Sequence, residues 1–284
     1  MRSHLMARFG VESVHELQPR LTELWSENRW MRADRGGWPV LFVKVYARPD
    51  RGVIEQRASE ALPDGLSTRM VGHGHVDGAG QYSAFAWDDD LTDVTTDNAF
   101  SAGAGYLLAR LHSTRPPTSG LLPADPVTEE SYTAAMETLA RTFPEVYERV
   151  AGDLSGRRAR SVVREAESVA RDTPDVFLHG DLARRNIARR NATYLLLDLE
   201  RAGVGPAELD LARIWGRELS ILKDRHRFLA CYRHHRGLPP SWPNRSLLRF
   251  ARLRCAVTTL ITACRRGDSA FASEGHQMLR DVLR

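Results

Sequence analysis

The chain has 284 residues, of which 42% are apolar and 27% charged. These are the proportions of a soluble globular enzyme, and they exclude a disordered or fibrous chain. No apolar run is long enough to span a bilayer, and the N-terminus lacks the apolar stretch of a secretory signal. We therefore expect a cytoplasmic protein with no membrane partner, built as one large domain or two lobes.

The basic residues are almost all arginines. The net charge is +4, and among 40 basic residues only Lys44 and Lys223 are lysines. A nucleic-acid-binding protein would carry a continuous basic stripe interleaved with aromatic residues, and no such stripe is present. We therefore expect no nucleic-acid partner. In a chain that uses arginine almost everywhere else, each lysine is a candidate for a role that arginine cannot perform.

The first 85 residues have mainly the pattern of strands. Residues 27–34 and 38–47 are rich in β-favouring side chains and are separated by the turn at Gly36-Gly37. Residues 53–62 space their apolar side chains as one helix would. A further strand is predicted over 81–87, where it ends in the acidic run Asp88, Asp89 and Asp90.

The rest of the chain has mainly a helical pattern. Helices are predicted over 97–113, 129–143 and 155–172, with a proline-rich loop over 115–126. A short β segment over 176–200 interrupts them, and the helical pattern then resumes with a break at 237–243. We therefore predict an α+β fold of two lobes, with a β-rich lobe over 1–85, a larger helical lobe over 86–284 and a cleft between them.

The β segment contains an ordered set of polar residues. His179-Gly180-Asp181 is followed by Asn186, and Asp198 comes after the apolar strand 194–197. Phosphoryl transfer needs a carboxylate to orient the attacking hydroxyl and accept its proton, and oxygen ligands to hold Mg²⁺ on the phosphates. Each residue alone could be a turn former or a strand terminator. The ordered set instead predicts a catalytic loop with Asp181, Asn186 and Asp198 at one site.

The sequences HGDLARRNI, LLLDLE and GPAELDLA resemble the aminoglycoside-phosphotransferase family, whose members share the bilobal protein-kinase-like fold. The resemblance implies that Asp181 is the catalytic base and that Asn186 and Asp198 are the metal ligands. It also implies that Asp210 braces the catalytic loop from a following helix and that His179 shapes this loop. ATP (or GTP) and Mg²⁺ are the cofactors that such a family member uses.

The same resemblance assigns residues of the first lobe to the nucleotide. Lys44 falls on the third strand, where the family keeps a lysine for the α- and β-phosphates. Its partner is a helix glutamate, for which Glu55 and Glu60 compete, and the spacing favours Glu55 because Glu60 adjoins the helix end. The segment 24–31 resembles the loop that covers the phosphates, with Ser26 and Asn28 as its polar residues, although it lacks glycines. The backbone of Phe85, Ala86 and Trp87 is expected to form the hinge that pairs with a purine.

The loop sequence HGDLARRN also resembles that of tyrosine kinases, but two features oppose a protein substrate. Gly180 replaces the arginine that would sense a phosphorylated activation loop, and only eleven residues separate Asp198 from Asp210. We therefore predict a kinase that phosphorylates a hydroxyl of a small molecule. A catalytically idle nucleotide-binding scaffold is disfavoured because the full motif set is present.

The acceptor is not encoded in these motifs. Asp88, Asp89 and Asp90 could attract a cationic acceptor at the cleft mouth, although we favour a solvated turn for this run. An aminoglycoside or another antibiotic is our first expectation, because of this acidic run and because of the best-known use of the family that the sequence resembles. A sugar, a choline-like amino alcohol or homoserine is left open as the acceptor, and the chain could be a monomer or a homodimer.

Overall fold

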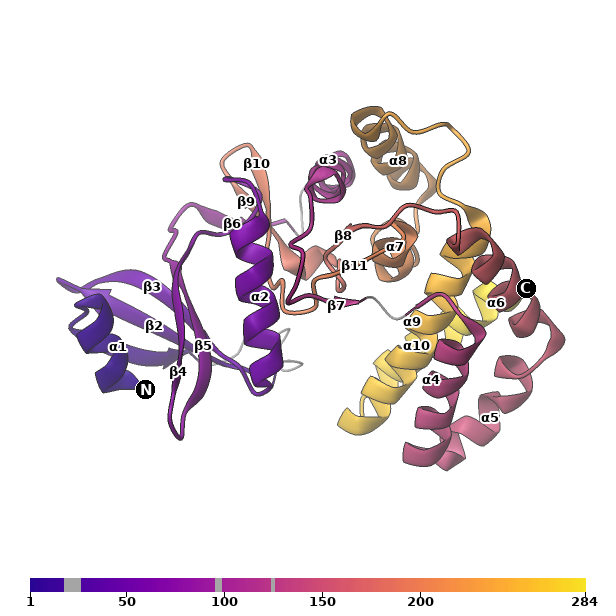
Figure 1. Cartoon of the computed structure of the whole chain (residues 1–284), viewed down its shortest axis with the longest axis horizontal. Helices are drawn as coiled ribbons and strands as arrows, with labels where there is room; N and C mark the ends of the chain where they lie inside the picture. The colour runs from indigo at the N-terminus through magenta and orange to yellow at the C-terminus, as the bar shows by residue number, and fades with distance from the viewer. Residues whose placement is uncertain (18–26, 95–98, 124–125) are drawn as a thin grey trace.

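The computed structural model describes residues 1–17, 27–94, 99–123 and 126–284. These residues form a β-sheet lobe at the N-terminal side and a helical lobe at the C-terminal side (Figure 1). This is the α+β, two-lobed fold that the sequence predicts. No helix in the described ranges combines the length and apolar character that crossing a bilayer requires.

The first lobe is built around one antiparallel sheet in the order β1-β2-β3-β5-β4. Its strands are β1 (Ser13–Leu17), β2 (Arg29–Arg35), β3 (Trp38–Val45), β4 (Met70–Val76) and β5 (Gly80–Ala86). The turn between β2 and β3 places both Gly36 and Gly37 at positive φ, as the sequence suggests. Helix α2 (Pro49–Ala61) begins at a proline and follows β3.

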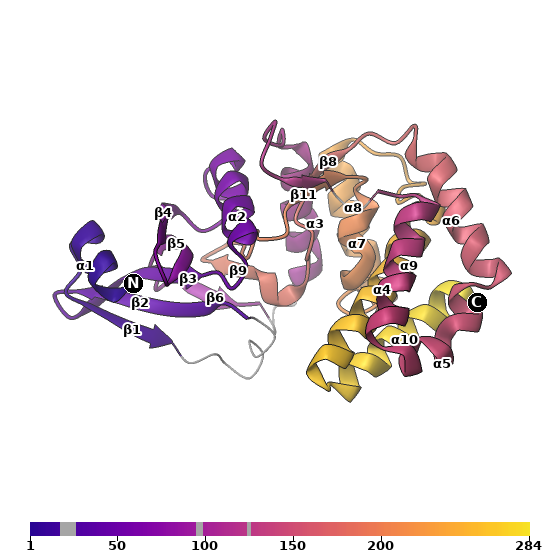
Figure 2. The same cartoon turned by 60° about the horizontal axis from the view of Figure 1, so that its bottom comes forward.

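Helix α1 (Arg2–Phe9) was not expected from the sequence. It is a weakly amphipathic helix whose single buried residue is Leu5, so its periodic signal is small. Leu5 packs into the core of the first lobe together with Val14, Met31 and Val43. Helices α1 and α2 lie on opposite sides of β4 and β5 (Figure 1 and Figure 2).

Short strands connect the two lobes. One three-stranded sheet has the order β10-β9-β6 and another has the order β7-β11-β8. Their bounds are β6 (Leu91–Asp93), β7 (Leu122–Pro123), β8 (Val176–Leu178), β9 (Ile187–Arg190), β10 (Thr193–Leu196) and β11 (Gly203–Gly205). The large sheet ends at Ala86 and the next strand, β6, already pairs with β9. The sheet of the first lobe thus extends one residue past the lobe boundary that we propose between residues 85 and 86.

The second lobe is helical, and its described residues contain two large hydrophobic cores and one small cluster of Val176, Leu178 and Ala207. Its helices are α3 (Phe100–Ser113), α4 (Glu129–Thr142), α5 (Pro144–Leu154), α6 (Arg157–Ala170), α7 (Glu208–Ile214), α8 (Leu222–Arg236), α9 (Arg245–Arg266) and α10 (Ser269–Leu283). Helix α5 was not predicted as a separate element; Pro144 ends the run of α4 and starts a new helix after one residue.

The first of these cores, which we call the catalytic core, packs α2, α3, α7 and α8 against the segment 177–202. The second, which we call the helical core, packs α4, α5, α6, α9 and α10 together. Figure 1 shows the same division, with α3, α7 and α8 beside the short strands and the other five helices farther from the sheet. The predicted catalytic loop therefore belongs to the first core only.

Candidate active site

The segment His179–Asp181 follows the buried strand β8 and is held by a carboxylate on α7. The two oxygens of Asp210 accept hydrogen bonds from the backbone N–H of His179 and of Gly180, each at 2.8 Å. The Nε2 of His112 lies 3.1 Å from the Asp210 Oδ2. Asp210 therefore fixes two consecutive peptide groups directly before Asp181, as the sequence predicts for a brace.

Asp210 is ionised and its buried neighbour His112 is neutral, which suits the hydrogen bond between them. Burial lowers the pKa of His112, so its ring is neutral, and its Nε2–H donates to Asp210 while its Nδ1 accepts from Tyr232 at 2.6 Å. Burial opposes the charge on Asp210, but the hydrogen bonds that it accepts outweigh this and lower its pKa. His179 acts as a loop former, because its Nε2 contacts the carbonyl oxygen of Leu197 at 2.9 Å.

Gly180 is required by two features of its position. Its φ is +77°, and a Cβ placed there would lie 1.9 Å from the carbonyl oxygen of Arg201. Any other residue would be strained and would also collide with the chain that follows Asp198. The segment after Asp198 therefore runs directly across the catalytic loop, which explains why this position cannot carry the arginine of a protein kinase.

Asp181 lies between two arginines. Its Oδ2 accepts a hydrogen bond from Arg185 at 2.7 Å, and its Oδ1 lies 3.6 Å from the Nε of Arg213. Burial alone would raise the pKa of Asp181, but the guanidinium groups of Arg213, Arg185 and Arg201 outweigh it and hold the pKa below its usual value. Asp181 is therefore ionised at neutral pH and can accept a hydrogen bond from a substrate hydroxyl.

Asn186 is fixed beside Asp181 by its own side-chain nitrogen. The Nδ2 donates to the Asp181 carbonyl oxygen at 2.8 Å and lies 3.4 Å from its Oδ2. This geometry assigns the nitrogen to the loop, so the Oδ1 of Asn186 is the atom available for other ligands. The loop thus presents a carboxylate and an amide oxygen within one turn, which is the arrangement that the spacing of these residues predicts.

Lys44 joins the first lobe to the catalytic segment. It lies on β3, and its Nζ is 2.8 Å from Glu55 Oε2, 2.5 Å from Asp198 Oδ1 and 2.9 Å from Glu200 Oε2. Our expectations that Lys44 faces Asp198 and that Glu55, not Glu60, is its helix partner are confirmed. Burial disfavours the ammonium, but the three carboxylates outweigh it and raise the pKa of Lys44, so it stays charged.

Glu55 is itself tied to both lobes. Its Oε2 accepts from the hydroxyl of Tyr46 at 2.6 Å, and its Oε1 accepts from the backbone N–H of Leu199 at 3.1 Å. Because Leu199 directly follows Asp198, α2 holds the position of that segment as well as that of Lys44. Sequence reasoning identified the ion pair but not this second tie.

Three carboxylates could hold a cation. Oxygens of Glu55, Asp198 and Glu200 all lie within 4.8 Å of one another. Asp198 has a φ of +59°, which is uncommon for a residue other than glycine and points to a functional constraint. Carboxylate oxygens are the ligands that Mg²⁺ prefers, so the donor set fits this ion. Our sequence analysis missed Glu200; its only signal is an acidic residue two positions after Asp198.

Ser26 and Asn28 are the two polar residues expected in the loop that covers the phosphates. Ser26 lies outside the described residues. Asn28 donates from its Nδ2 to Glu200 Oε2 at 2.7 Å and accepts from the N–H of Ala47 at 3.1 Å. It is therefore connected to the carboxylates around Lys44 rather than standing apart on a loop.

In the predicted hinge segment, the backbone N–H groups of Ala86 and Trp87 are already used within the sheet. The N–H of Ala86 donates to Arg69 and the N–H of Trp87 donates to Val40, at 2.9 and 3.0 Å. Both groups complete the sheet edge, so neither is available to a purine. Within the described ranges the next N–H, that of Asp88, makes no hydrogen bond. Phe85 lies on the same sheet face as Lys44, since it pairs with Phe42 while Lys44 pairs with Ser83.

The acidic run after this strand has local partners. Asp88 forms an ion pair with Arg190 and also accepts from the N–H of Asp90 at 3.1 Å. Asp89 accepts from the indole nitrogen of Trp87 at 2.7 Å. None of the three acids lines the cavity beside Asp181. The structure thus does not bring this run to the catalytic loop.

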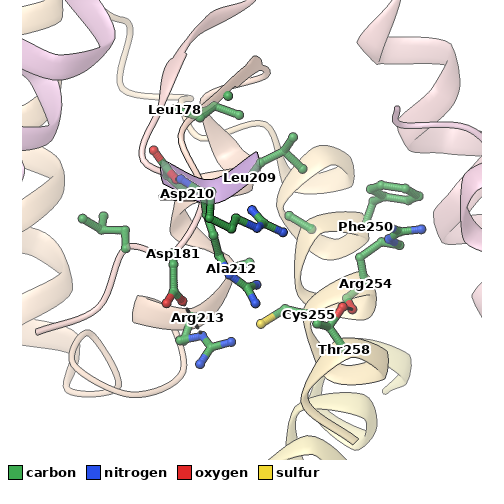
Figure 3. Close-up of a pocket in the computed structure, with 16 residues that line it drawn as sticks. Leu178, Asp181, Leu209, Asp210, Ala212, Arg213, Phe250, Arg254, Cys255 and Thr258 are labelled. Atoms are coloured by element: carbon green, nitrogen blue, oxygen red, sulfur yellow. Dashed lines mark hydrogen bonds and ion pairs between the residues drawn. The ribbon is translucent and has the colours of Figure 1, made fainter. Parts of the chain in front are cut away.

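That cavity, of about 290 Å³, lies between the catalytic loop and α9 (Figure 3). Asp181 and Arg213 lie on one side of it, and Cys255 points toward it from α9 on the other. Phe250 and Arg254 of α9 also line it, but the guanidinium of Arg254 donates to the carbonyl oxygen of Ser131 on α4. The described residues that line it do not include Lys44 or Asp198.

The β-sheet lobe, the helical lobe and this loop define a phosphotransferase with a protein-kinase-like fold. The model of the phosphotransferase enzyme family matches residues 58–248, and the chain belongs to this family. No curated protein matches the sequence significantly.

Solved structures with the same fold have low sequence identity to this chain. A GDP and kanamycin complex of APH(2″)-IIia is 14% identical with a TM-score of 0.66, covering 99% of this chain and 97% of that one. The choline kinase LicA from Streptococcus pneumoniae is 17% identical with a TM-score of 0.67, covering 99% and 96%. A spectinomycin phosphotransferase with ADP and spectinomycin is 12% identical with a TM-score of 0.65, covering 98% and 92%.

Proposed function

We propose that this protein transfers the γ-phosphoryl group of ATP, or of GTP, to a hydroxyl group of a small molecule. The observation that carries the proposal is the position of Asp181. It is an ionised carboxylate at the wall of a cavity, on the loop that also holds Asn186. Membership of the phosphotransferase family supports the same reaction. The related structures contain GDP or ADP, which supports a nucleoside triphosphate as donor.

The reaction balances with the groups present. The acceptor hydroxyl donates a hydrogen bond to Asp181, its oxygen bonds to the γ-phosphorus, and its proton passes to the Asp181 carboxylate. The bond from the γ-phosphorus to the bridging oxygen breaks, and the nucleoside diphosphate leaves. Because its pKa is held low, Asp181 is a weak base, so we expect it to act mainly by orienting the hydroxyl and to take the proton late.

Asp198, Glu200 and the Oδ1 of Asn186 are the oxygens that we propose hold Mg²⁺. The ion supplies charge neutralisation on the β- and γ-phosphates when it is bound. Lys44 contributes a fixed ammonium for the α- and β-phosphates, and Glu55 holds it on the cleft side of β3. For a purine, we propose the backbone N–H of Asp88 as the hinge donor.

A catalytically idle scaffold is disfavoured, because Lys44, Glu55, Asp181, Asn186 and Asp198 are all present. The acceptor could still be an antibiotic or a metabolite such as a sugar, an amino alcohol or homoserine. The related structures include a kanamycin complex, a spectinomycin complex and a choline kinase, so the fold alone accommodates several acceptors.

The test is Asp181→Asn in a phosphate-transfer assay with a panel of hydroxylated compounds. We expect kcat to fall by about 10²–10⁴ because the hydroxyl loses its charged acceptor, while Mg²⁺-dependent nucleotide affinity is kept. The matched control is Asp175→Asn, an exposed acid before β8 that should leave both quantities unchanged. Near-normal turnover in Asp181→Asn would refute the assignment.

A further inference from the structure

The short turn that carries Asn186 is held by a carboxylate outside the site described so far. This turn, a single 3₁₀ turn over Arg184–Asn186, follows Asp181 and leads into β9. The backbone N–H of Arg184 donates to Glu218 Oε1 at 3.0 Å. Glu218 lies 34 positions further along the chain, after the end of α7, so the sequence alone does not reveal the contact.

The hydrogen bond to Glu218 and the hydrogen bond that closes the turn share one peptide group. The carbonyl oxygen of Ala183 accepts from the N–H of Asn186 at 3.0 Å, and this carbonyl lies in the same peptide plane as the N–H of Arg184. Because a peptide group is planar, fixing the direction of its N–H also fixes the direction of its carbonyl. Ala183 is buried, so this peptide needs protein partners in place of water. Glu218 therefore orients the peptide that receives the N–H of Asn186.

Glu218 is itself placed by the turn that follows α7. The next residue, Leu219, is buried in the catalytic core, and its N–H donates to the carbonyl oxygen of Ile214 at 2.9 Å. Arg225 of α8 holds the same turn, because its Nε donates to the carbonyl oxygen of Leu219 at 3.0 Å and its guanidinium carbon lies 4.4 Å from the ring centre of Trp215. These contacts fix the backbone around Glu218, so its carboxylate meets the catalytic loop at a defined point.

Two carboxylates therefore hold the catalytic loop at two different places. Asp210 accepts from the two peptide groups directly before Asp181, and Glu218 accepts from a peptide group between Asp181 and Asn186. The Nδ2 of Asn186 is bound to the carbonyl oxygen of Asp181, so the direction of its Oδ1 depends on the turn between these two residues. This Oδ1 is the atom that we propose as a Mg²⁺ ligand.

We propose that Glu218 is a positioning residue for the metal site: it fixes the turn that presents the Oδ1 of Asn186 to Mg²⁺, without touching the ion. This inference rests on the proposed function, because it uses the metal ligand assigned there. Residues that orient a metal ligand from behind typically change metal affinity by about 10–100-fold. Glu218 acts on the backbone of the turn, one step behind the ligand side chain, so we expect an effect at the lower end of this range.

The experiment measures the affinity for Mg²⁺ directly. The full chain, saturated with a non-hydrolysable ATP analogue, is titrated with Mg²⁺ by calorimetry, and binding of the analogue alone is measured in EDTA. Glu218→Ala should weaken Mg²⁺ binding by about tenfold, while the affinity for the analogue in EDTA stays within about twofold of the wild type. The matched control is Glu148→Ala, at an exposed position of α5, which should change neither quantity.

Two conservative variants separate the hydrogen bond from the charge of Glu218. Glu218→Gln keeps an oxygen that can accept from the N–H of Arg184. Its NH₂ group takes the place of Oε2, which makes no hydrogen bond to the described residues, so no other contact is lost and most of the Mg²⁺ affinity should remain. Glu218→Asp keeps the charge but is too short to reach Arg184, so it should weaken Mg²⁺ binding as Glu218→Ala does. It also replaces Glu218→Ala if the alanine variant does not fold.

A double-mutant cycle tests whether the effect passes through Asn186. Asn186→Ala removes the proposed ligand, so adding Glu218→Ala to it should weaken Mg²⁺ binding no further. Wild-type Mg²⁺ affinity in Glu218→Ala, additive losses in the double variant, or equal losses in Glu218→Gln and Glu218→Ala would each overturn the inference and leave the phosphotransferase function intact. Mg²⁺ binding that does not depend on Asn186 in the wild-type chain would overturn the proposed metal site and this inference together.

Discussion

Replacing Asp210 by asparagine tests how the catalytic loop is held. Asp210 is buried and accepts from the N–H of His179, from the N–H of Gly180 and from His112. An asparagine offers one oxygen and one NH₂ group, so the NH₂ must face one of the two backbone donors. The variant therefore loses one charge-assisted hydrogen bond and leaves a buried N–H without an acceptor.

Each of these losses costs about 1–3 kcal/mol, so we expect Asp210→Asn to lower the free energy of unfolding by roughly 3–5 kcal/mol. An unfolding entropy of about 2.1 cal/mol/K per residue corresponds to about 0.6 kcal/mol/K for this chain length. The melting temperature should thus fall by roughly 5–8 °C. Because Asp181 follows the released peptide groups directly, kcat should fall as well, with little change in nucleotide affinity.

The measurement is calorimetry at neutral pH, with Asp175→Asn as the exposed control. The pKa of Asp210 is lowered in the folded state, so its stabilising effect is complete above the unfolded value of about 3.9 and is lost as the pH falls through the folded value. The difference between wild type and variant should therefore persist at neutral pH and narrow only at strongly acidic pH. A melting temperature within about 1 °C of the wild type would refute the reasoning.

Three further predictions concern the same loop. Asp198→Ala should abolish most of the Mg²⁺ dependence of nucleotide binding, because the ion loses a carboxylate ligand, and calorimetry with and without Mg²⁺ would reveal any retained dependence. Gly180→Ala should reduce both stability and kcat, because its Cβ would lie 1.9 Å from the Arg201 carbonyl oxygen; a normal melting curve would contradict this. As the pH falls, kcat should decrease where Asp181 becomes protonated, which we expect below about pH 4 because its pKa is lowered. Arg213→Gln removes a positive neighbour of Asp181 and should move this decrease in kcat to higher pH. An unchanged pH dependence of kcat in Arg213→Gln would show that Arg213 does not lower the pKa of Asp181.

The catalytic loop could be predicted from the sequence because its chemistry needs particular residue types at short spacing. Asp181, Asn186 and Asp198 lie within 18 positions, and the pairing of β9 with β10 brings Leu197, which precedes Asp198, against the backbone of Asn186. The Lys44–Glu55 pair was also predictable, since lysine is rare in this chain and the spacing favours Glu55. Glu200, which contacts Lys44 and Asn28, was missed because nothing in the motif around Asp198 distinguishes it from an ordinary acidic residue.

The acceptor side could not be predicted in the same way. The arginines that line the cavity beside Asp181 come from separate elements. In a chain where nearly every basic residue is arginine, none of them stands out in the sequence. The acidic run was conspicuous in the sequence, yet Asp88 pairs with Arg190 across the β6–β9 connection and Asp89 with Trp87. Contacts between side chains of distant segments decide which charged groups are free to bind a ligand, and the order of residues along the sequence does not show these contacts.

The division of the second lobe into two cores has a consequence for how such a protein can change over evolutionary time. Phe177, Leu182 and Leu196 pack in the catalytic core, and most of the buried apolar residues of α9 pack in the helical core, but Leu248 of α9 packs in the catalytic core. Helix α9 also packs against α7, which carries Asp210. A substitution that tilts α9 therefore acts on the helix that holds the catalytic loop, so the wall of the cavity and the position of Asp181 have to evolve together.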